Sequence, residues 1–262
     1  MKRYIKSGVQ IVGNDFVFDF EHNSKDDIIE IQTPQIFKSS INNNLYWFGY
    51  IFKPHVSSRD RTKFIHYLKG LSEPSISDAD LKRFIQRPLQ YLSPEVNLAN
   101  LDCFVYPLSG RSKLVNTMIR VINQFTGHDT NRVNFEMIKS APTDVQFDWK
   151  LFNSEWDTPE TKLQYMQMKK YIEDILIPKI HQQNYFSIAK NVKAKYRPYI
   201  KNYLKFASTE ESDNFSNLSN ANILVIDDIN ASGSTLNEVL RILNSRNNRC
   251  NIYVYTLIEH TS

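Results

Sequence analysis

The residues best suited to chemistry lie near the end of the chain, where two acids precede a run of small and hydroxylated residues. Asp227 and Asp228 follow the aliphatic residues 223–226, and the run 231–235, Ala-Ser-Gly-Ser-Thr, leads into a segment whose apolar spacing is helical. Carboxylates accept hydrogen bonds from the vicinal hydroxyls of a sugar. Backbone N–H groups and the dipole at a helix N-terminus bind a phosphate, and hydroxyls add donors. The stretch therefore predicts a site for a ribose 5-phosphate.

A buried strand and a helix are needed to position these groups. Four consecutive aliphatic residues are typical of a strand that is buried on both faces, as central parallel strands are. The acids come where this strand ends, which is the edge of an open α/β sheet that binds ligands. A strand terminus followed by an ordinary helix N-cap is the alternative interpretation. We favour the ligand site because strand, acid pair, loop and helix follow one another without a gap.

The same stretch resembles the phosphoribosyl-pyrophosphate (PRPP) loop of the type I phosphoribosyltransferases. In that loop, four apolar residues precede two acids, two further residues and a Thr/Ser-Thr/Ser-Gly-x-Thr/Ser run. The resemblance implies that Asp227 and Asp228 are the catalytic pair that holds the ribose hydroxyls, the first partly through magnesium-bound water, so that no residue binds the metal directly. It implies that the 5-phosphate is bound by Ala231, Ser232, Gly233, Ser234 and Thr235. Two positions depart from the pattern: Asn230 replaces an aliphatic residue, and Ala231 supplies no hydroxyl.

A second loop with charged donors, residues 107–113, follows an apolar segment. Gly110 lets the backbone approach a ligand closely, and Arg111 and Lys113 supply charge-assisted donors. In the type I family, the loop after the first core strand binds the pyrophosphate of PRPP. The resemblance therefore implies that Ser109, Gly110 and Arg111 bind pyrophosphate. A strand-to-helix turn with two solvated cations is the alternative.

A third stretch, residues 190–206, has six basic residues and no acidic residue, and aromatic residues are interleaved with them. Cations that follow phosphates, alternating with rings that stack on bases, are typical of a surface for single-stranded nucleic acid. On this interpretation Lys193, Lys195 and Arg197 contact the nucleic acid. The alternative is a pair of surface helices broken at Pro198, with the tyrosines turned inward and the lysines solvated.

Composition sets broad limits on the class of protein. A chain of 262 residues with 41% hydrophobic residues can bury a full core. A net charge of +4 permits anionic partners without requiring them. The two cysteines, Cys103 and Cys250, do not indicate a disulfide scaffold or a structural zinc site. Because no apolar run has transmembrane or signal-peptide character, we expect a cytoplasmic protein without a membrane partner.

The pattern of elements predicts an α/β fold with a mainly parallel sheet flanked by helices. The resemblance makes this a type I phosphoribosyltransferase-like, Rossmann-like core, at about 99–138 and 221–260, and its tail resembles ComF-type proteins. We expect an N-terminal α+β domain at 1–98, and a core domain at 99–262 with a helical insertion at about 139–220. Strands are expected at 9–12, 16–20, 45–52, 101–106, 132–138, 223–226 and 251–258, and helices at 58–70, from 77, 113–125, from 158 and 236–243.

Two further segments are expected to be loops. Residues 140–149 take the place of the family's mobile catalytic loop, which closes over the substrate. Residues 209–220 are polar and are expected to be a mobile loop.

The resemblance implies a glycosyltransferase of nucleotide metabolism. Such an enzyme transfers phosphoribose from PRPP, which carries Mg²⁺, to a nitrogen acceptor and releases pyrophosphate. The sequence does not identify the acceptor. A second hypothesis is a binding or regulatory module with this fold, or an effector of a bacterial defence system that acts with RNA or a protein partner. The large insertion and the basic, aromatic stretch at 190–206 motivate it.

Overall fold

The computed structural model of the chain forms two compact units. It describes residues 4–13, 15–21, 26–32, 37–38, 45–73, 75–92, 97–108, 114–127, 132–230 and 233–259. The first unit comprises Met1–Phe135, Asn217–Ala231 and Arg249–Ser262, and the second comprises Glu136–Ser216 and Ser232–Asn248. The first unit includes residues on both sides of the predicted boundary at 98, and the second unit lies wholly beyond it. The division into 1–98 and 99–262 stays a prediction.

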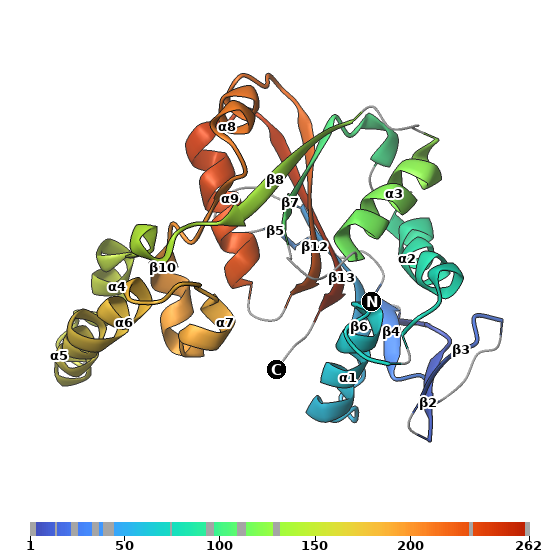
Figure 1. Cartoon of the computed structure of the whole chain (residues 1–262), viewed down its shortest axis with the longest axis horizontal. Helices are drawn as coiled ribbons and strands as arrows, with labels where there is room; N and C mark the ends of the chain where they lie inside the picture. The colour runs from blue at the N-terminus through green and yellow to red at the C-terminus, as the bar shows by residue number, and fades with distance from the viewer. Residues whose placement is uncertain are drawn as a thin grey trace. The chain divides into compact units, whose positions relative to one another are not determined.

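The first unit is built on a sheet whose central strands are parallel (Figure 1). Its strands lie in the order β1 (Tyr4–Lys6), β4 (Ile29–Gln32), β6 (Leu45–Phe52), β13 (Asn251–Glu259), β12 (Asn222–Asn230) and β7 (Cys103–Pro107). Pairing is parallel from β6 through β13 and β12 to β7, and antiparallel between β1, β4 and β6. The short strand β5 (Phe37–Lys38) is antiparallel to β6. The α/β class with a mainly parallel central sheet is confirmed.

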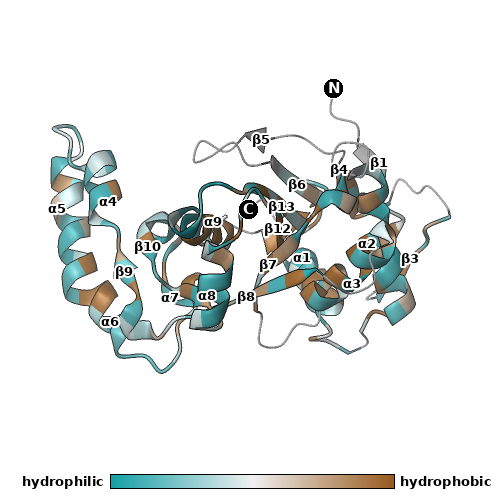
Figure 2. Ribbon diagram, turned by 90° about the horizontal axis from the view of Figure 1, so that it is seen from above, coloured by the Kyte–Doolittle hydropathy of each residue, from teal (hydrophilic) through white to brown (hydrophobic). Residues whose placement is uncertain are grey.

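Strand β12 is the centre of this sheet. Val225 lies opposite Val254 on one side and Val105 on the other. Its aliphatic residues 223–226 have no exposed surface, as expected for a strand covered on both faces. The hydropathy colouring shows this strand as hydrophobic (Figure 2).

The described residues of the first unit also form three helices and a hairpin. They are α1 (Ser58–Leu68), α2 (Asp78–Leu92), α3 (Leu114–Thr126) and the antiparallel pair β2 (Val9–Val12) and β3 (Asp15–Phe18), with a short 3-10 helix η1 (Leu98–Asn100). The helix predicted from Ser77 is confirmed, because the Ser77 hydroxyl accepts a hydrogen bond of 3.1 Å from the Asp80 N–H. Aromatic rings fill the core: Tyr50 and Phe84 stack at 4.0 Å between centroids, and Phe64 lies edge-on to Phe84 at 5.9 Å.

The described part of the second unit contains two antiparallel strand pairs and mostly short helices. Strand β8 (Val133–Lys139), whose first residues belong to the first unit, pairs with β11 (Leu204–Phe206), and β9 (Gln146–Phe147) pairs with β10 (Ile200–Lys201). The helices are α4 (Trp149–Trp156), α5 (Lys162–Tyr171), α6 (Ile177–His181), α7 (Ile188–Asn191), α8 (Thr209–Ser216) and α9 (Ser234–Arg246), together with η2 (Pro142–Asp144), the π-helical turn η3 (Ile172–Leu176) and η4 (Ala194–Tyr199).

The predicted loop at 209–220 is wrong, because α8 occupies much of it. The Ser208 hydroxyl accepts a hydrogen bond of 3.1 Å from the Glu211 N–H, as a helix N-cap does. Phe215 is fully buried, and its ring centroid is 5.3 Å from that of Phe206. One capping hydroxyl and one buried ring therefore make a helix of this polar segment.

Two other segments differ from the expected local structure. Residues 140–149, expected at the place of a mobile loop, contain η2, β9 and the start of α4, and Val145 is buried. Residues 190–206 form η4 and short strands rather than two helices. Among the described residues, no helix has the length and apolar character that a membrane span needs.

Candidate functional site

The two acids lie inside the last part of strand β12, in the first unit. The strand runs to Asn230, four residues beyond the predicted end at 226, because its pairing with β13 continues to Ile229 opposite Ile258 and Asn230 opposite Glu259. Asp227 lies opposite Thr256, and the two aspartates, taken as whole residues, are 7% and 6% exposed. The acids are thus at the carboxyl end of a central parallel strand, as the sequence predicts, but they belong to the strand.

A lysine that the sequence analysis did not select contacts this pair. The Lys69 Nζ atom lies 2.6 Å from Oδ2 of Asp228, and the Asp228 N–H donates a hydrogen bond of 2.9 Å to Oδ1 of Asp227. Burial, followed by the charge of Asp228, raises the pKa of Asp227 well above its ordinary value, while the Lys69 ammonium acts in the opposite direction. The pair therefore has two unequal members, one with a cation at its oxygen and one that burial favours in the neutral form.

The end of helix α1 fixes the backbone of Lys69. Lys69 is the C-cap residue of α1, and Gly70 follows with a φ of +65°, a conformation that glycine adopts without strain. The Leu71 N–H donates to the His66 carbonyl at 2.8 Å and the Gly70 N–H to the Tyr67 carbonyl at 3.2 Å, the pattern of a Schellman motif. The sequence Leu-Lys-Gly indicates such a helix end. It does not indicate which residue the lysine contacts.

Replacing Asp227 by asparagine should stabilise the protein at neutral pH and have no effect at about pH 4. An acid whose pKa is raised in the folded state contributes stability below its unfolded value of about 3.9, and this is lost as the pH rises through the folded value. Asparagine does not ionise, and its Oδ1 still accepts from the Asp228 N–H. Melting temperatures of wild type and D227N at pH 4, 6 and 8 test this. Parallel pH profiles of the two proteins would show that the Asp227 carboxyl is not perturbed.

The run that the sequence predicts to bind the phosphate is described in part, at the start of helix α9 in the second unit. Gly233 has a φ of +70° and precedes the helix, and its carbonyl accepts from the Asn237 N–H at 2.8 Å. Ser234 is buried and Thr235 is half-buried. Ala231 and Ser232 lie outside the described residues. The described part thus has the left-handed glycine and helix start that a phosphate cradle needs.

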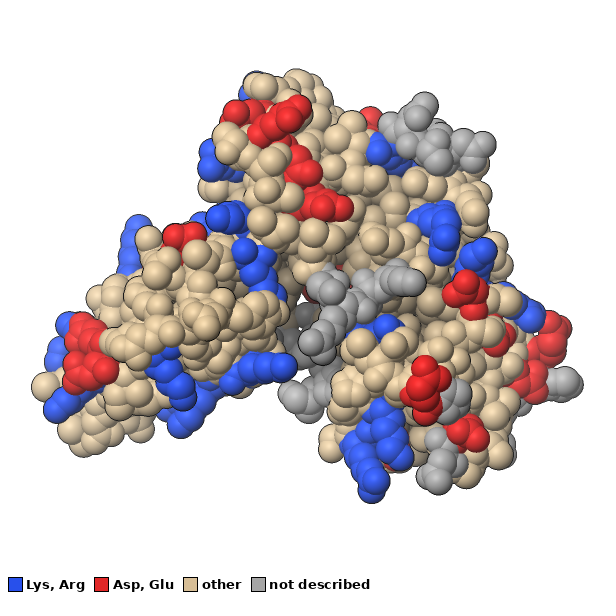
Figure 3. All heavy atoms as spheres, viewed as in Figure 1, with Lys and Arg blue, Asp and Glu red and all other residues tan. Residues whose placement is uncertain are grey.

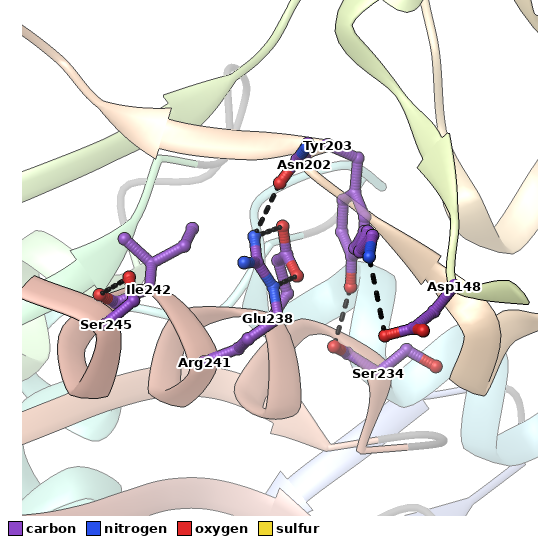
Figure 4. Close-up of polar contacts among 9 residues, drawn as sticks. Asp148, Asn202, Tyr203, Ser234, Glu238, Arg241, Ile242 and Ser245 are labelled. Carbon is purple, nitrogen blue, oxygen red and sulfur yellow. Dashed lines mark hydrogen bonds and ion pairs between the residues drawn. The ribbon is translucent and has the colours of Figure 1, made fainter. Parts of the chain in front are cut away.

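The end of the insertion holds the start of α9 in place (Figure 4). The Tyr203 hydroxyl donates a hydrogen bond of 2.6 Å to the Ser234 carbonyl. Arg241 donates to both carboxylate oxygens of Glu238, at 2.7 and 2.9 Å, and to Oδ1 of Asn202 at 2.9 Å. Glu238 is 3% exposed, so this ion pair is buried on the acid's side. The contacts attach the turn after β10 to the helix whose first residues would bind the phosphate.

The predicted pyrophosphate loop, Ser109, Gly110 and Arg111, lies outside the described residues. The elements on either side of it are those that the sequence predicts. Strand β7 precedes the loop and is fully buried, and helix α3 follows it. The loop's role stays a prediction.

The basic, aromatic stretch packs its rings inward. Tyr196, Tyr199 and Tyr203 are each 4% exposed, so they offer no face on which bases could stack. Arg197 donates to the carbonyls of Val192 and Ala189, both at 2.9 Å, which supports the end of α7. This arrangement favours the alternative interpretation of inward tyrosines.

The lysines of the same stretch are exposed. Lys193 and Lys195 lie over the rings of Tyr171 and Tyr196, at 5.7 and 4.8 Å from Nζ to the centroid. Basic and acidic side chains both occur on the face of the second unit that Figure 3 shows. The positions of the lysines therefore fit both a nucleic-acid surface and a solvated one.

A polar pocket of about 750 Å³ lies within the second unit, between η2, β11, α8 and α9. Its charged lining residues are the cations Lys205, Arg241 and Arg246 and the acids Asp144 and Asp213. The sequence analysis did not predict this pocket. Because its lining carries both signs of charge, the pocket does not select one class of ligand.

The C-terminal part of the chain matches a family model. Residues 181–262, which are less than half of the chain, match the model of the phosphoribosyl transferase domain. This part of the chain is similar to that domain. The matched residues include the acid pair, the run 231–235 and helix α9, so the resemblance to type I phosphoribosyltransferases is confirmed over this part. The ComF-type detail stays a prediction.

Solved structures with some similarity include two crystal forms of a hypoxanthine phosphoribosyltransferase from Staphylococcus aureus. The tetragonal form is 14% identical with a TM-score of 0.34, and the match covers 70% of this chain and 65% of that one. The orthorhombic form is 15% identical with a TM-score of 0.32, and the match covers 71% and 68%. The chain thus spans slightly less than two thirds of the first structure. No curated protein matches the sequence.

Proposed function

We propose that this chain binds PRPP at residues 227–235 and transfers its phosphoribosyl group to a nitrogen acceptor, with release of pyrophosphate. One structural observation is the main support for the proposal. A buried pair of acids lies in the last part of a central parallel strand, and the glycine and the helix start of a phosphate cradle follow a few residues later in the chain. The family match over residues 181–262 supports phosphoribosyl transfer as the general reaction.

The acid pair would hold the ribose. Carboxylate oxygens of Asp227 and Asp228 would accept hydrogen bonds from the two ribose hydroxyls, and each such charge-assisted bond contributes about 1.5–3 kcal/mol. Positive charge grows at the anomeric carbon as pyrophosphate departs. Fixed carboxylates with little solvent access stabilise such charge better than water does.

The start of α9 would hold the 5-phosphate. Its first N–H groups have no partner within the helix and carry the positive end of the dipole. The hydroxyls of Ser232, Ser234 and Thr235 would add donors, while Ala231 and Gly233 would contribute backbone N–H groups. Ser109, Gly110 and Arg111 would bind the pyrophosphate through backbone donors and a guanidinium.

Magnesium fits this site as a companion of the substrate. Among the described residues there is no cluster of three or more potential metal ligands, and no ion pair of Asp227 is found there. Asp227 would contact the metal through water, while PRPP oxygens would bind it directly. When bound, Mg²⁺ would neutralise charge on the leaving pyrophosphate. A cytoplasmic enzyme of nucleotide metabolism would use this chemistry.

PRPP with Mg²⁺ should raise the melting temperature of the protein. A ligand that binds only the folded state stabilises it by about 2.7 kcal/mol at a hundredfold excess over its dissociation constant. Thermal-shift titrations with PRPP and with ribose 5-phosphate measure the effect, and inorganic phosphate at the same concentration is the control. A flat titration up to millimolar PRPP would reject the proposed site.

Pyrophosphate release with a panel of nitrogen bases then separates an enzyme from a binding module. An enzyme releases pyrophosphate with one of the acceptors, and a regulatory module binds PRPP without releasing it. Binding without release from any acceptor would favour the module.

A further inference from the structure

The contact between Lys69 and the acid pair links two parts of the first unit that are far apart in the sequence. The Lys69 side chain is 19% exposed and that of Asp228 is 8% exposed, with 2.6 Å between Nζ and Oδ2. The contact is therefore a largely buried ion pair rather than a surface one. Its acid, Asp228, is one of the two that bind the ribose in the proposed function.

The backbone of Lys69 is held from two directions. The Schellman motif at Gly70 sets the end of α1, and Phe64 and Leu68, which are 0% and 2% exposed, anchor the helix in the core. A lysine at a helix C-terminus is also favoured by the negative end of the helix dipole. The backbone position from which the Lys69 ammonium reaches Asp228 is therefore fixed.

The ion pair gives the two oxygens of the Asp228 carboxylate different roles. The oxygen of this carboxylate that contacts Lys69 is Oδ2. A carboxylate has two oxygens with about four lone-pair sites, so one oxygen can keep a cation while the other accepts from a ligand. Lys69 also balances the buried negative charge of Asp228.

We propose that Lys69 is a positioning residue of the acid pair: by holding Oδ2 of Asp228 it fixes this carboxylate so that Oδ1 accepts from a ribose hydroxyl. The inference rests on the proposed function, because it assumes that a ribose binds here. Lys69 acts through Asp228 and not by contact with the phosphate groups. Its contribution should therefore appear with a ligand that has no pyrophosphate.

Calorimetric titration with ribose 5-phosphate tests this. Lys69→Met should weaken binding at least tenfold, and Lys69→Arg, which keeps a cation, should stay within about threefold of wild type. Lys69→Gln keeps a hydrogen-bond donor but carries no charge, and it should bind ribose 5-phosphate at least threefold more weakly than the wild type. It replaces Lys69→Met in the experiment if the methionine variant does not fold. Lys53→Met is the matched control, because Lys53 also pairs with an acid of the first unit, Glu30, at 3.8 Å. The Lys53→Met variant should bind ribose 5-phosphate with the affinity of the wild type.

A double-mutant cycle decides whether Lys69 acts through Asp228. In an Asp228→Asn background, Lys69→Met should weaken binding no further. Equal affinity of Lys69→Met and wild type, with only a lower melting temperature, would reduce Lys69 to a structural role and overturn the inference. Tighter binding by Lys69→Met would overturn it too, since the amine would then compete with the ribose. A wild type that does not bind ribose 5-phosphate would reject the proposed function as well, whereas binding that is unchanged in the variant rejects only the role of Lys69.

Discussion

A protein that carries D227N and D228N together should bind PRPP at least tenfold more weakly than the wild type. The two changes keep the volume of each side chain and remove two charged acceptors, each of which contributes roughly 1.5–3 kcal/mol through a charge-assisted hydrogen bond. Losing one such bond already weakens binding by tenfold or more. Calorimetric titration with PRPP and Mg²⁺ measures the change.

The ion pair with Lys69 makes a third substitution necessary in this experiment. D228N leaves the Lys69 ammonium without its counter-charge, and breaking a buried pair in this way costs up to about 3–5 kcal/mol. Because Lys69 is 19% exposed, water can reach it in part and the cost should fall toward the lower end. A triple variant that adds Lys69→Met removes the unpaired cation and separates folding from binding. Wild-type PRPP affinity in a folded double or triple variant would refute the assignment of the site.

Arg241→Met should lower the free energy of unfolding by about 3 kcal/mol. The substitution leaves Glu238, which is 3% exposed, without the two hydrogen bonds at 2.7 and 2.9 Å that balance its charge. It also removes the hydrogen bond to Asn202 that attaches the end of the insertion to α9. Urea unfolding monitored by circular dichroism gives the free energy.

The reciprocal change gives the matched control. Glu238→Gln leaves Arg241, which is 39% exposed and can be hydrated, so it should cost clearly less than Arg241→Met. The double variant should recover part of the loss, because neither charge is then left alone. If Glu238→Gln costs as much as Arg241→Met, the asymmetry of burial does not control the energy of this pair.

Local patterns in the sequence predicted the elements that carry the proposed chemistry. The aliphatic run 223–226 is buried because a parallel strand lies on each side of it, and such runs rarely occur elsewhere. Leu45–Phe52 and the helix after Ser77 were likewise predictable, from aromatic content and a capping hydroxyl. Each of these signals lies within a few residues of the element that it predicts.

Features that depend on distant partners were not predictable from one sequence. Strand β12 includes both acids because β13 continues to pair with it, and nothing near Asp227 indicates that register. The ion pair between Lys69 and Asp228 joins residues in different elements. The tyrosines at 196, 199 and 203 suit a stacking surface by spacing, yet they are buried because the insertion folds around them.

The pairing of β8 with β11 gives the insertion a simple topology. Lys139 and Leu204 are partners across an antiparallel ladder, so the chain leaves and returns at neighbouring points. A two-residue turn of the Asn-Gly type could join these partners as an ordinary β-hairpin. Closing a longer loop between fixed ends adds only about 0.6 kcal/mol for each doubling of its length. Residues 140–203 are therefore a single excursion between two paired strands, and Asn202 and Tyr203 attach the end of this excursion to α9.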